Sequence, residues 1–207
     1  MMNERSIGGK RERRAGKRRG IPSTKHRLGR EEGPIRFVAA RTDIGWVLVA
    51  GTGRGLCSIR LGDSRQALID ATKARFDKVE HLEGDPESVR WLRGVTELIE
   101  SPQRGLSLPL DIRGTPFQRK VWRELQRIPV GATASYGEIA RRIGMPGAAR
   151  AVARACASNP LPLAVPCHRV VRSDGELGGY GGGVERKRAL LEREAGSPSP
   201  AAGRGTV

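Results

Sequence analysis

A cysteine and a histidine stand side by side in residues 166–170, which read Pro-Cys-His-Arg-Val. A thiol and an imidazole are the two side chains best suited to form and tune a nucleophile near neutral pH. The apolar residues 161–165 precede Cys167 and His168 and would bury them, and the glycine-rich residues 178–183 follow and would leave room for a substrate. We therefore take this segment as the candidate site.

Three kinds of chemistry compete for this pair, beside the plain alternative of a buried structural cysteine. A metal site is the weakest, because no third and fourth ligand lies nearby in the sequence. A Cys-His hydrolase meets a geometric objection: neighbours in an extended segment point to opposite sides, so Cys167 and His168 would need a turn or a bridging water to interact. The third kind is a thiolate that accepts a group from a substrate a single time. It is the most compatible with indirect activation through a turn or a water, because it has to be activated only when the substrate arrives. Burial would raise the pKa of the thiol, so some group must activate it.

The composition bounds the class of protein. The chain has 207 residues and a formal net charge of +16, from 38 Lys and Arg against 22 Asp and Glu. No apolar stretch approaches the ~18 residues that would suggest a membrane span, and no apolar signal-peptide core follows the basic N-terminus. We expect a soluble, cytoplasmic protein that does not bind membranes.

Cys57, Cys156 and Cys167 are scattered without CxxC spacing. The sequence therefore predicts neither a disulfide framework nor a zinc site, and no other metal or cofactor.

The positive charge is concentrated at the N-terminus. Residues 1–30 carry eleven basic side chains against Glu4 and Glu12, a net of +9, which leaves +7 for residues 31–207. A stretch so rich in Arg and Gly and so poor in apolar residues cannot bury enough surface to fold. We predict a disordered basic arm over residues 1–34 that is attracted to a polyanion such as nucleic acid. A purely solvating tail is the alternative.

Residues 35–111 show the mixture of short strands and helices expected of a small α/β subdomain. The glycines of residues 51–55 predict a hairpin turn rather than a phosphate-binding loop, because they lack GxGxxG spacing and a strand follows. Nothing in this subdomain suggests chemistry. Its predicted elements are strands at 36–40, 45–50 and 56–61, helices at 64–76 and 86–100, and a final strand at 106–111.

Residues 112–195 predict a helical subdomain with explicit helix starts. Thr115 and Ser135 each open a capping box, with Gln or Glu three residues later. A last helix is predicted at 184–195, and a disordered tail at 196–207. The predicted fold class is therefore α+β.

The second and third helices of this subdomain are joined by a tight turn that contains Gly144, which is typical of a helix-turn-helix unit. The third helix, at 148–158, has small side chains and presents Arg150 and Arg154 on its surface. A basic helix that recognises DNA is the functional interpretation, and a plain helical hairpin is the alternative. The overall charge favours DNA.

Five motifs carry a family resemblance over about residues 36–195. They are Thr-Pro-Phe-Gln…Val-Trp at 115–122, Ser-Tyr-Gly-Glu-Ile-Ala at 135–140, Ala-Arg-Ala-Val at 149–152, Asn-Pro at 159–160 and Pro-Cys-His-Arg-Val-Val at 166–171. On these motifs the sequence resembles the O6-alkylguanine-DNA alkyltransferases, and within that family the methyltransferase half of the bacterial adaptive-response proteins.

The resemblance implies a fold, a reaction and a partner. The N-terminal subdomain would be ribonuclease-H-like, and the protein a monomer without a cofactor. The reaction would be direct, irreversible transfer of a methyl or other small alkyl group from guanine O6, or thymine O4, to Cys167, which inactivates the protein. The partner would be double-stranded DNA that contains the alkylated base. It would be approached from the minor groove, with the target nucleotide flipped out of the stack.

The same resemblance assigns roles to individual residues. Glu194 would hold His168, which takes the proton from Cys167 through a water, while Asn159 supports the turn around the site. Tyr136 would crowd the target phosphate and offer its hydroxyl to the base. The remaining positions for substrate or DNA contact are Arg150, which would enter the stack in place of the flipped base, Gly181, whose backbone N–H would donate to O6, Ser135, Arg169 and Val170.

The sequence departs from the family pattern in informative places. Gly181 stands where some relatives have Ser. Glycine keeps the backbone N–H donor and adds flexibility. Residues 1–34 contain no Cys, so the cysteine-rich zinc domain of the adaptive-response proteins has no counterpart there and we expect no regulatory activity. The alkyltransferase-like proteins that bind lesions without repairing them lack the reactive cysteine, and Cys167 argues against that class.

Overall fold

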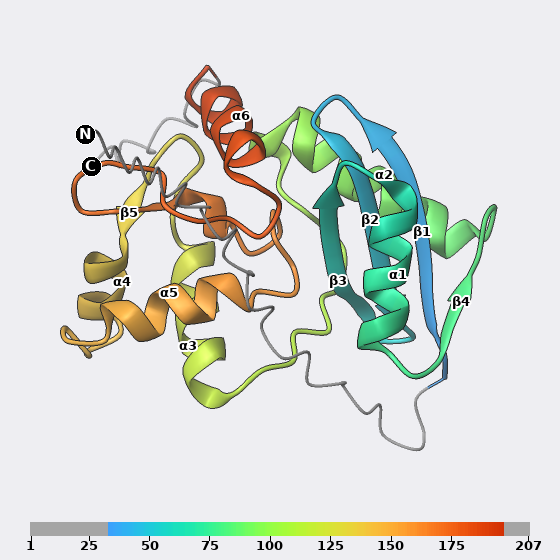
Figure 1. Cartoon of the computed structure of the whole chain (residues 1–207), viewed down its shortest axis with the longest axis horizontal. Helices are drawn as coiled ribbons and strands as arrows, with labels where there is room; N and C mark the ends of the chain where they lie inside the picture. The colour runs from blue at the N-terminus through green and yellow to red at the C-terminus, as the bar shows by residue number, and fades with distance from the viewer. Residues whose placement is uncertain (1–32, 197–207) are drawn as a thin grey trace, which may run out of the picture.

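The computed structural model describes residues 33–196, so nearly all of the predicted basic arm at 1–34 and of the tail at 196–207 lies outside the described residues. Within the described range, a sheet flanked by helices lies beside a group of further helices (Figure 1). This is the predicted α+β class. None of the helices in residues 33–196 is long and apolar enough to cross a membrane.

The N-terminal part is built on a four-stranded sheet of order β3-β2-β1-β4. The predicted hairpin is confirmed, because β2 and β3 are antiparallel and joined by a tight turn. Gly55 has a φ of 130°, and a Cβ there would lie 2.2 Å from the carbonyl oxygen of Pro109, so the position requires glycine. The strands are β1 (Ile35–Thr42), β2 (Gly45–Thr52), β3 (Gly55–Gly62) and β4 (Val79–His81), of which β4 runs parallel to β1.

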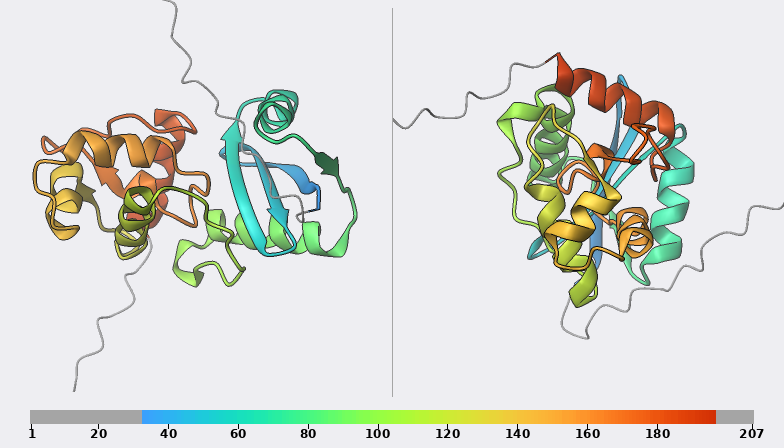
Figure 2. Two further views of the ribbon diagram at one scale, coloured as in Figure 1. Left: turned by 90° about the horizontal axis from the view of Figure 1, so that it is seen from below. Right: turned by 90° about the vertical axis from the view of Figure 1, so that its left-hand side faces the viewer.

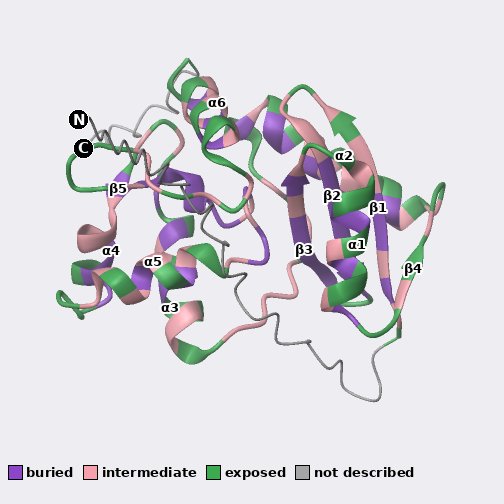
Figure 3. Ribbon diagram, viewed as in Figure 1, coloured by how far each residue is buried: buried purple, intermediate pink, exposed green. Residues whose placement is uncertain are grey.

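Helices cover both faces of this sheet, as the left view of Figure 2 shows. Successive residues of β2 alternate between the two faces: Leu48 belongs to the cluster under α1 (Arg65–Arg75), and Val49 to the cluster that includes α2 (Pro86–Glu100). Because both faces are covered, β2 is buried along most of its length (Figure 3). Both predicted helices of this part are confirmed.

The predicted final strand at 106–111 is wrong. The segment makes only an isolated parallel bridge between Leu110 and Leu56 of β3. Pro109 has no N–H to donate to a ladder, although its carbonyl accepts a hydrogen bond from the Leu56 N–H at 2.9 Å. The fourth strand is instead β4, a three-residue segment with two polar side chains that carries no recognisable strand pattern.

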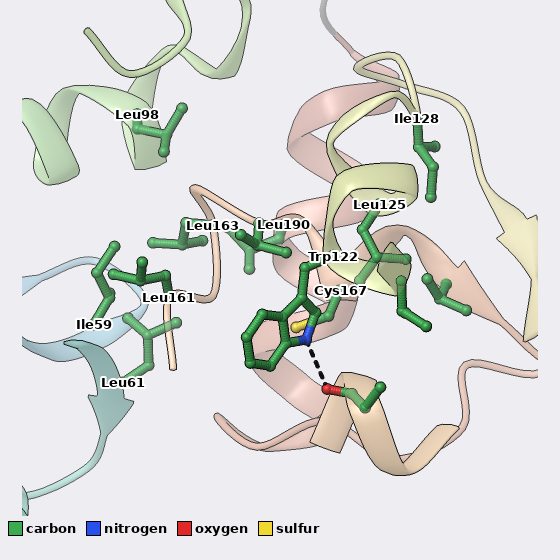
Figure 4. Close-up of a cluster of buried hydrophobic side chains, with 14 of the residues drawn as sticks. Ile59, Leu61, Leu98, Trp122, Leu125, Ile128, Leu161, Leu163, Cys167 and Leu190 are labelled. Carbon is green, nitrogen blue, oxygen red and sulfur yellow. Dashed lines mark hydrogen bonds between the residues drawn. The ribbon is translucent and has the colours of Figure 1, made fainter. Parts of the chain in front are cut away.

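The helical part begins with α3 (Pro116–Gln126) and α4 (Tyr136–Arg142), and both predicted capping boxes are present. α5 (Ala149–Ala157) packs against α3, and the indole Nε1–H of Trp122 donates to the carbonyl of Ala155 at 2.9 Å (Figure 4). This bond satisfies the one polar atom of a buried tryptophan. The remaining elements are the two short parallel strands β5 (Ala134–Ser135) and β6 (Val170–Val171), the 3₁₀ turns η1 (Pro102–Arg104) and η2 (Cys167–Arg169), and α6 (Val184–Ala195).

One hydrophobic cluster joins the sheet to the helices. It includes Ile59 and Leu61 of β3 together with Leu125, Leu163 and Cys167. Figure 4 shows side chains of the two parts facing each other across it. β3 is an edge strand, and its Ile59 N–H donates to the carbonyl of Pro160 at 2.8 Å. The edge of the sheet therefore fixes the loop that leads to Cys167.

Candidate active site

Cys167 lies in a turn, not in an extended segment. Residues Cys167–Arg169 form η2, and the Arg169 N–H donates to the Pro166 carbonyl at 3.0 Å. The expectation that neighbouring side chains point to opposite sides therefore fails here, because a 3₁₀ turn rotates successive side chains by about a third of a circle. The apolar residues before it behave as predicted: Leu161, Leu163 and Val165 are buried.

The thiol of Cys167 is buried and held by one amide. Asn159 Nδ2 lies 3.1 Å from Sγ and also 2.8 Å from the Val165 carbonyl, while Asn159 Oδ1 accepts from the Leu161 N–H at 3.0 Å. Burial raises the pKa of the thiol, whereas the Asn159 amide and the charge of Lys187 lower it, and burial dominates. The cysteine therefore rests as a neutral thiol beside groups that would favour the thiolate.

His168 is oriented by a buried carboxylate. Its Nε2 lies 2.8 Å from Glu194 Oε1, and both side chains are almost fully buried. Burial raises the pKa of Glu194, but hydrogen bonds from His168 and Arg169 outweigh it and bring the value to about 2. Because the ionised carboxylate only accepts, Nε2 must carry the proton.

The other nitrogen of this imidazole is a free base. Nδ1 of His168 is buried and has no hydrogen-bond partner among the described residues. Burial lowers the pKa of His168, although Glu194 raises it. At neutral pH the ring is therefore uncharged, with the lone pair of Nδ1 able to take a proton.

The side chain of Arg169 lies in the interior, not on a surface that DNA could contact. We assigned it to substrate or DNA contact, but its side chain is buried and makes two hydrogen bonds to Glu194, at 2.9 and 2.8 Å, and one to the Ile128 carbonyl at 2.6 Å. A buried carboxylate without a cationic partner would be costly, and this paired geometry supplies that partner. Arg169 therefore positions Glu194.

Lys187 of α6 is a buried cation that the sequence analysis did not identify. Its Nζ donates to the carbonyl of Val170 at 2.5 Å and to that of Leu177. Val170, which we assigned to substrate contact, is itself fully buried. Lys187 stands three residues before Leu190 and seven before Glu194, on the buried face of α6, and this helical spacing is the signal that could have revealed it.

The first residues of α4 and its cap include Ser135 and Tyr136, to which the resemblance assigns contacts with the substrate or DNA. Ser135 is the N-cap, with its Oγ accepting from the Glu138 N–H at 3.1 Å. Tyr136 follows and is half-buried. Burial raises the pKa of its hydroxyl, and negative charge on the nearby sulfurs of Cys156 and Cys167 raises it further. Tyr136 therefore lies close enough to Cys167 for the two side chains to interact electrostatically.

Arg150 lies apart from the buried groups. It is exposed near the start of α5, as is Arg154 one turn later, whereas Val152 and Ala155 face the core. The predicted basic outer face of this helix is confirmed.

A cavity of about 260 Å³ reaches Cys167, and Asn159 and Gly181 line it beside the cysteine. Cys156 also lines it, and burial raises the pKa of that thiol to about 12. The hydroxyl of Tyr180 is buried without a partner in the described part of the chain, and its ring meets His168 edge-on at 6.4 Å. The residues that line the cavity therefore include Tyr180, whose buried hydroxyl lacks a hydrogen-bond partner in the described range.

Comparisons with known proteins agree on one family. The model of the "6-O-methylguanine DNA methyltransferase, DNA binding domain" matches residues 116–196. The methylated-DNA–protein-cysteine methyltransferase of Mycolicibacterium paratuberculosis is 42% identical over 165 residues, which are 77% of this chain and 92% of that protein. The crystal structure of Mycobacterium tuberculosis OGT in complex with DNA superposes with a TM-score of 0.65 at 39% identity, covering 77% of this chain and 92% of that one.

A longer relative is also similar. The bifunctional transcriptional activator/DNA repair enzyme Ada of Escherichia coli (strain K12) is 44% identical over 183 residues, which are 88% of this chain and 52% of Ada. The regulatory protein ada of Salmonella typhimurium is matched over 50% of its length. The chain thus spans about half the length of these two relatives.

Proposed function

Because the chain belongs to the methylated-DNA–protein-cysteine methyltransferase family, we propose that it repairs alkylated DNA by moving the alkyl group onto Cys167. The substrate is double-stranded DNA with a methyl or other small alkyl group on guanine O6, or on thymine O4. The observation that carries the proposal is the arrangement of Cys167 and His168 on one turn. The buried thiol accepts a hydrogen bond from the Asn159 amide, and the imidazole is hydrogen-bonded to Glu194 through Nε2 while its Nδ1 has no partner in the described residues.

The proton leaves Cys167 when the substrate is in place. The Nδ1 lone pair of His168 takes it, through a bridging water, and Glu194 stabilises the imidazolium that forms. The Asn159 amide and the buried ammonium of Lys187 stabilise the developing thiolate. The thiolate sulfur then attacks the alkyl carbon, and the electron pair of the broken C–O bond stays on the base.

The leaving oxygen needs a donor as it gains charge. The hydroxyl of Tyr136, which stays protonated because burial raises its pKa, serves as that donor. The backbone N–H of Gly181, a residue that lines the cavity at Cys167, is the second. These donors make the base a better leaving group without any metal.

The DNA lies against the helical part. Chemistry on a base inside a duplex requires that the nucleotide leave the stack. The exposed Arg150 at the start of α5 fills the space that the flipped nucleotide leaves, with the small residues of α5 in the minor groove. The protein acts as a monomer in the cytoplasm, where a reducing environment keeps Cys167 a free thiol.

Mapping the acceptor atom tests the proposal. The protein is incubated with a duplex that contains one O6-methylguanine, digested and analysed by mass spectrometry. A gain of one methyl on the peptide that contains Cys167 is expected, with none on Cys57 or Cys156, whose pKa values burial raises to about 12. Cys167→Ser should bind the duplex without gaining mass. Binding of the lesion by the natural protein with no mass gain would instead identify a lesion-binding module.

A further inference from the structure

The turn that carries Gly181 is made almost entirely of glycine. Residues 178–183 are five glycines and Tyr180, and glycine restrains the backbone less than any other residue. The Gly183 N–H donates to the Tyr180 carbonyl at 3.0 Å, which makes Gly181 and Gly182 the two central residues of a β-turn. This bond closes the turn but does not fix its orientation, so a donor at Gly181 needs support from outside residues 178–183.

Arg186, in the first turn of α6, supplies such support. Its Nη1 donates to the Gly182 carbonyl at 2.7 Å, so the guanidinium is bonded to the β-turn itself. The side chain is only 13% exposed, which limits the positions that it can adopt. A guanidinium presents its donors in a rigid, planar fork, so the other bonds of Arg186 determine where it holds this carbonyl.

The same guanidinium is bonded to the N-terminal part of the protein. Nε donates to the carbonyl of Ile44, in the turn between β1 and β2, at 2.7 Å, and Nη2 pairs with Asp63 directly after β3. A Cβ on Gly45 would lie 2.6 Å from Nη2, so the guanidinium packs on the backbone at that position. Arg186 thus connects the β-turn at Gly181 to two segments of the sheet.

Arg193 of the same helix provides a comparison within the molecule. It lies two turns further along α6, donates to the Ile99 carbonyl at 3.0 Å and pairs with Asp43. These bonds also join α6 to the N-terminal part through one carbonyl and one carboxylate, but they do not involve residues 178–183. The two arginines therefore separate attachment of the helix from attachment of the β-turn.

We propose that Arg186 is a positioning residue for alkyl transfer: by holding the Gly182 carbonyl, it orients the β-turn so that the Gly181 N–H faces guanine O6. This inference rests on the proposed transfer to Cys167, in which that N–H donates to the leaving oxygen. Arg186 takes part in none of the bonds that form or break. It keeps the donor in place before charge develops on O6, so that little reorganisation is needed during the reaction.

Substitution of the two arginines tests whether the β-turn is the part that matters. Single-turnover rate constants are measured with saturating protein and a duplex that contains O6-methylguanine. Arg186→Gln should lower the rate constant about ten- to a hundredfold, less than the effect of deleting one such donor outright, because the N–H is displaced and not removed. Arg193→Gln should change it less than about threefold. Urea unfolding of both variants should show similar losses of stability, which excludes stability as the cause of the difference.

A variant that deletes the donor shows whether Arg186 acts through it. Proline has no N–H and is favoured at the first central position of a β-turn, and a Cβ on Gly181 would meet no atom within 4 Å outside its chain neighbours. Gly181→Pro therefore removes the donor and keeps the turn. In this background, Arg186→Gln should slow transfer by less than about threefold more, because the group that it positions is gone.

The leaving atom gives a second readout that does not depend on the proline variant. In S6-methyl-6-thioguanine a sulfur replaces O6, and sulfur accepts hydrogen bonds only weakly. Arg186→Gln should therefore slow transfer from this base less than about threefold. Equal slowing for the oxygen and sulfur bases would overturn the proposal, because Arg186 would then not act on the leaving atom.

The remaining outcomes are also decisive. Equal slowing by Arg186→Gln and Arg193→Gln would overturn the proposal and show that both arginines only attach α6. A full effect of Arg186→Gln in the Gly181→Pro background would overturn it as well. Transfer that is insensitive to Arg186→Gln would overturn this inference alone, whereas absence of methyl transfer to Cys167 in the natural protein would contradict the proposed function itself.

Discussion

At the scale of single residues, the site consists of buried groups held by two sets of hydrogen bonds. Arg169 pairs with Glu194, Glu194 accepts from His168, and Asn159 donates to Cys167. Because the carboxylate sits between a cation and an imidazole, it stays ionised and fixes the proton of the ring on Nε2. Burial keeps the ring neutral, although the charge of Glu194 opposes this by raising the pKa of His168. The positions of these groups thus decide which atom can act as the base.

The acid limb of the transfer rate reports on His168. Since only the neutral imidazole can take the proton, the rate should fall as the pH drops through the pKa of this histidine. Burial lowers that pKa from 6.5, so we expect the midpoint of the acid limb below 6.5. Single-turnover methyl transfer between pH 5 and 8 measures it, with circular dichroism at each pH to confirm that the protein remains folded. A midpoint at or above 6.5 would contradict this assignment.

Glu194 also contributes to stability in a pH-dependent way. Its pKa falls from 4.5 to about 2 on folding, so its stabilisation is complete above 4.5 and is lost as the pH falls toward 2. A shift of this size corresponds to about 3 kcal/mol as an order of magnitude. Glu194→Gln should remove this pH dependence and lower the free energy of unfolding by about 3 kcal/mol at pH 7, because it leaves Arg169 buried without its partner.

Urea unfolding at several pH values measures this effect, and exposed Glu192→Gln on the same helix is the control. A Glu194→Gln protein that keeps the pH dependence of the natural protein below pH 5 would refute the assigned role of the carboxylate.

The residues of the site differ in how far the sequence reveals them. Cys167 and His168 are evident from their types and adjacency, because few residues can make a nucleophile. Lys187 and the inward position of Arg169 are not, since charged side chains are almost never fully buried unless they are paired. Their burial depends on carbonyls and a carboxylate supplied by segments far away in the chain, such as Ile128 and Glu194.

At the scale of elements, helix caps position the site. The cap residue Ser135 fixes the start of α4 and hence Tyr136, while Thr115 fixes α3, whose first turn carries no assigned site residue. Ser135→Ala and Thr115→Ala should each lower the free energy of unfolding by about 1 kcal/mol. Only Ser135→Ala should also slow methyl transfer. Denaturation and single-turnover kinetics on both variants test this, and equal slowing by both would argue against a positioning role for the α4 cap.

Local sequence signals predicted most of the helices and strands. They failed where a strand depends on hydrogen bonds to a distant segment. Capping residues and apolar periodicity indicate α1 to α6 because a helix closes its own hydrogen bonds. Residues 106–111 have the composition of a strand, but Pro109 cannot continue a ladder and the segment makes one bridge. β4 is a strand only because β1 offers its edge to it. The turn at Cys167 is likewise set by contacts with Asn159 and with the edge of β3.

At the scale of the whole molecule, the sheet and the helices share one core, and charge is distributed unevenly along the chain. The net charge of +9 in residues 1–30 should increase affinity for any DNA by releasing counter-ions, without selecting the lesion. A protein that begins at residue 31 should show a shallower slope of log affinity against log salt concentration and weaker binding at low salt. Its rate constant at saturating DNA should be unchanged.

Fluorescence anisotropy at several salt concentrations measures these slopes. The full chain with the eleven basic residues of 1–30 replaced by Gln serves as a length-matched control. Loss of the methyl-transfer step itself on truncation would show that residues 1–30 do more than attract DNA.

We infer that each molecule uses Cys167 as an acceptor once. The most direct measurement is the amount of guanine restored when a known amount of protein meets a large excess of O6-methylguanine duplex. We expect a burst that stops at one equivalent per molecule, with all protein then carrying a methyl on Cys167. Repair that continues beyond one equivalent, or a burst with an unmodified Cys167, would contradict it.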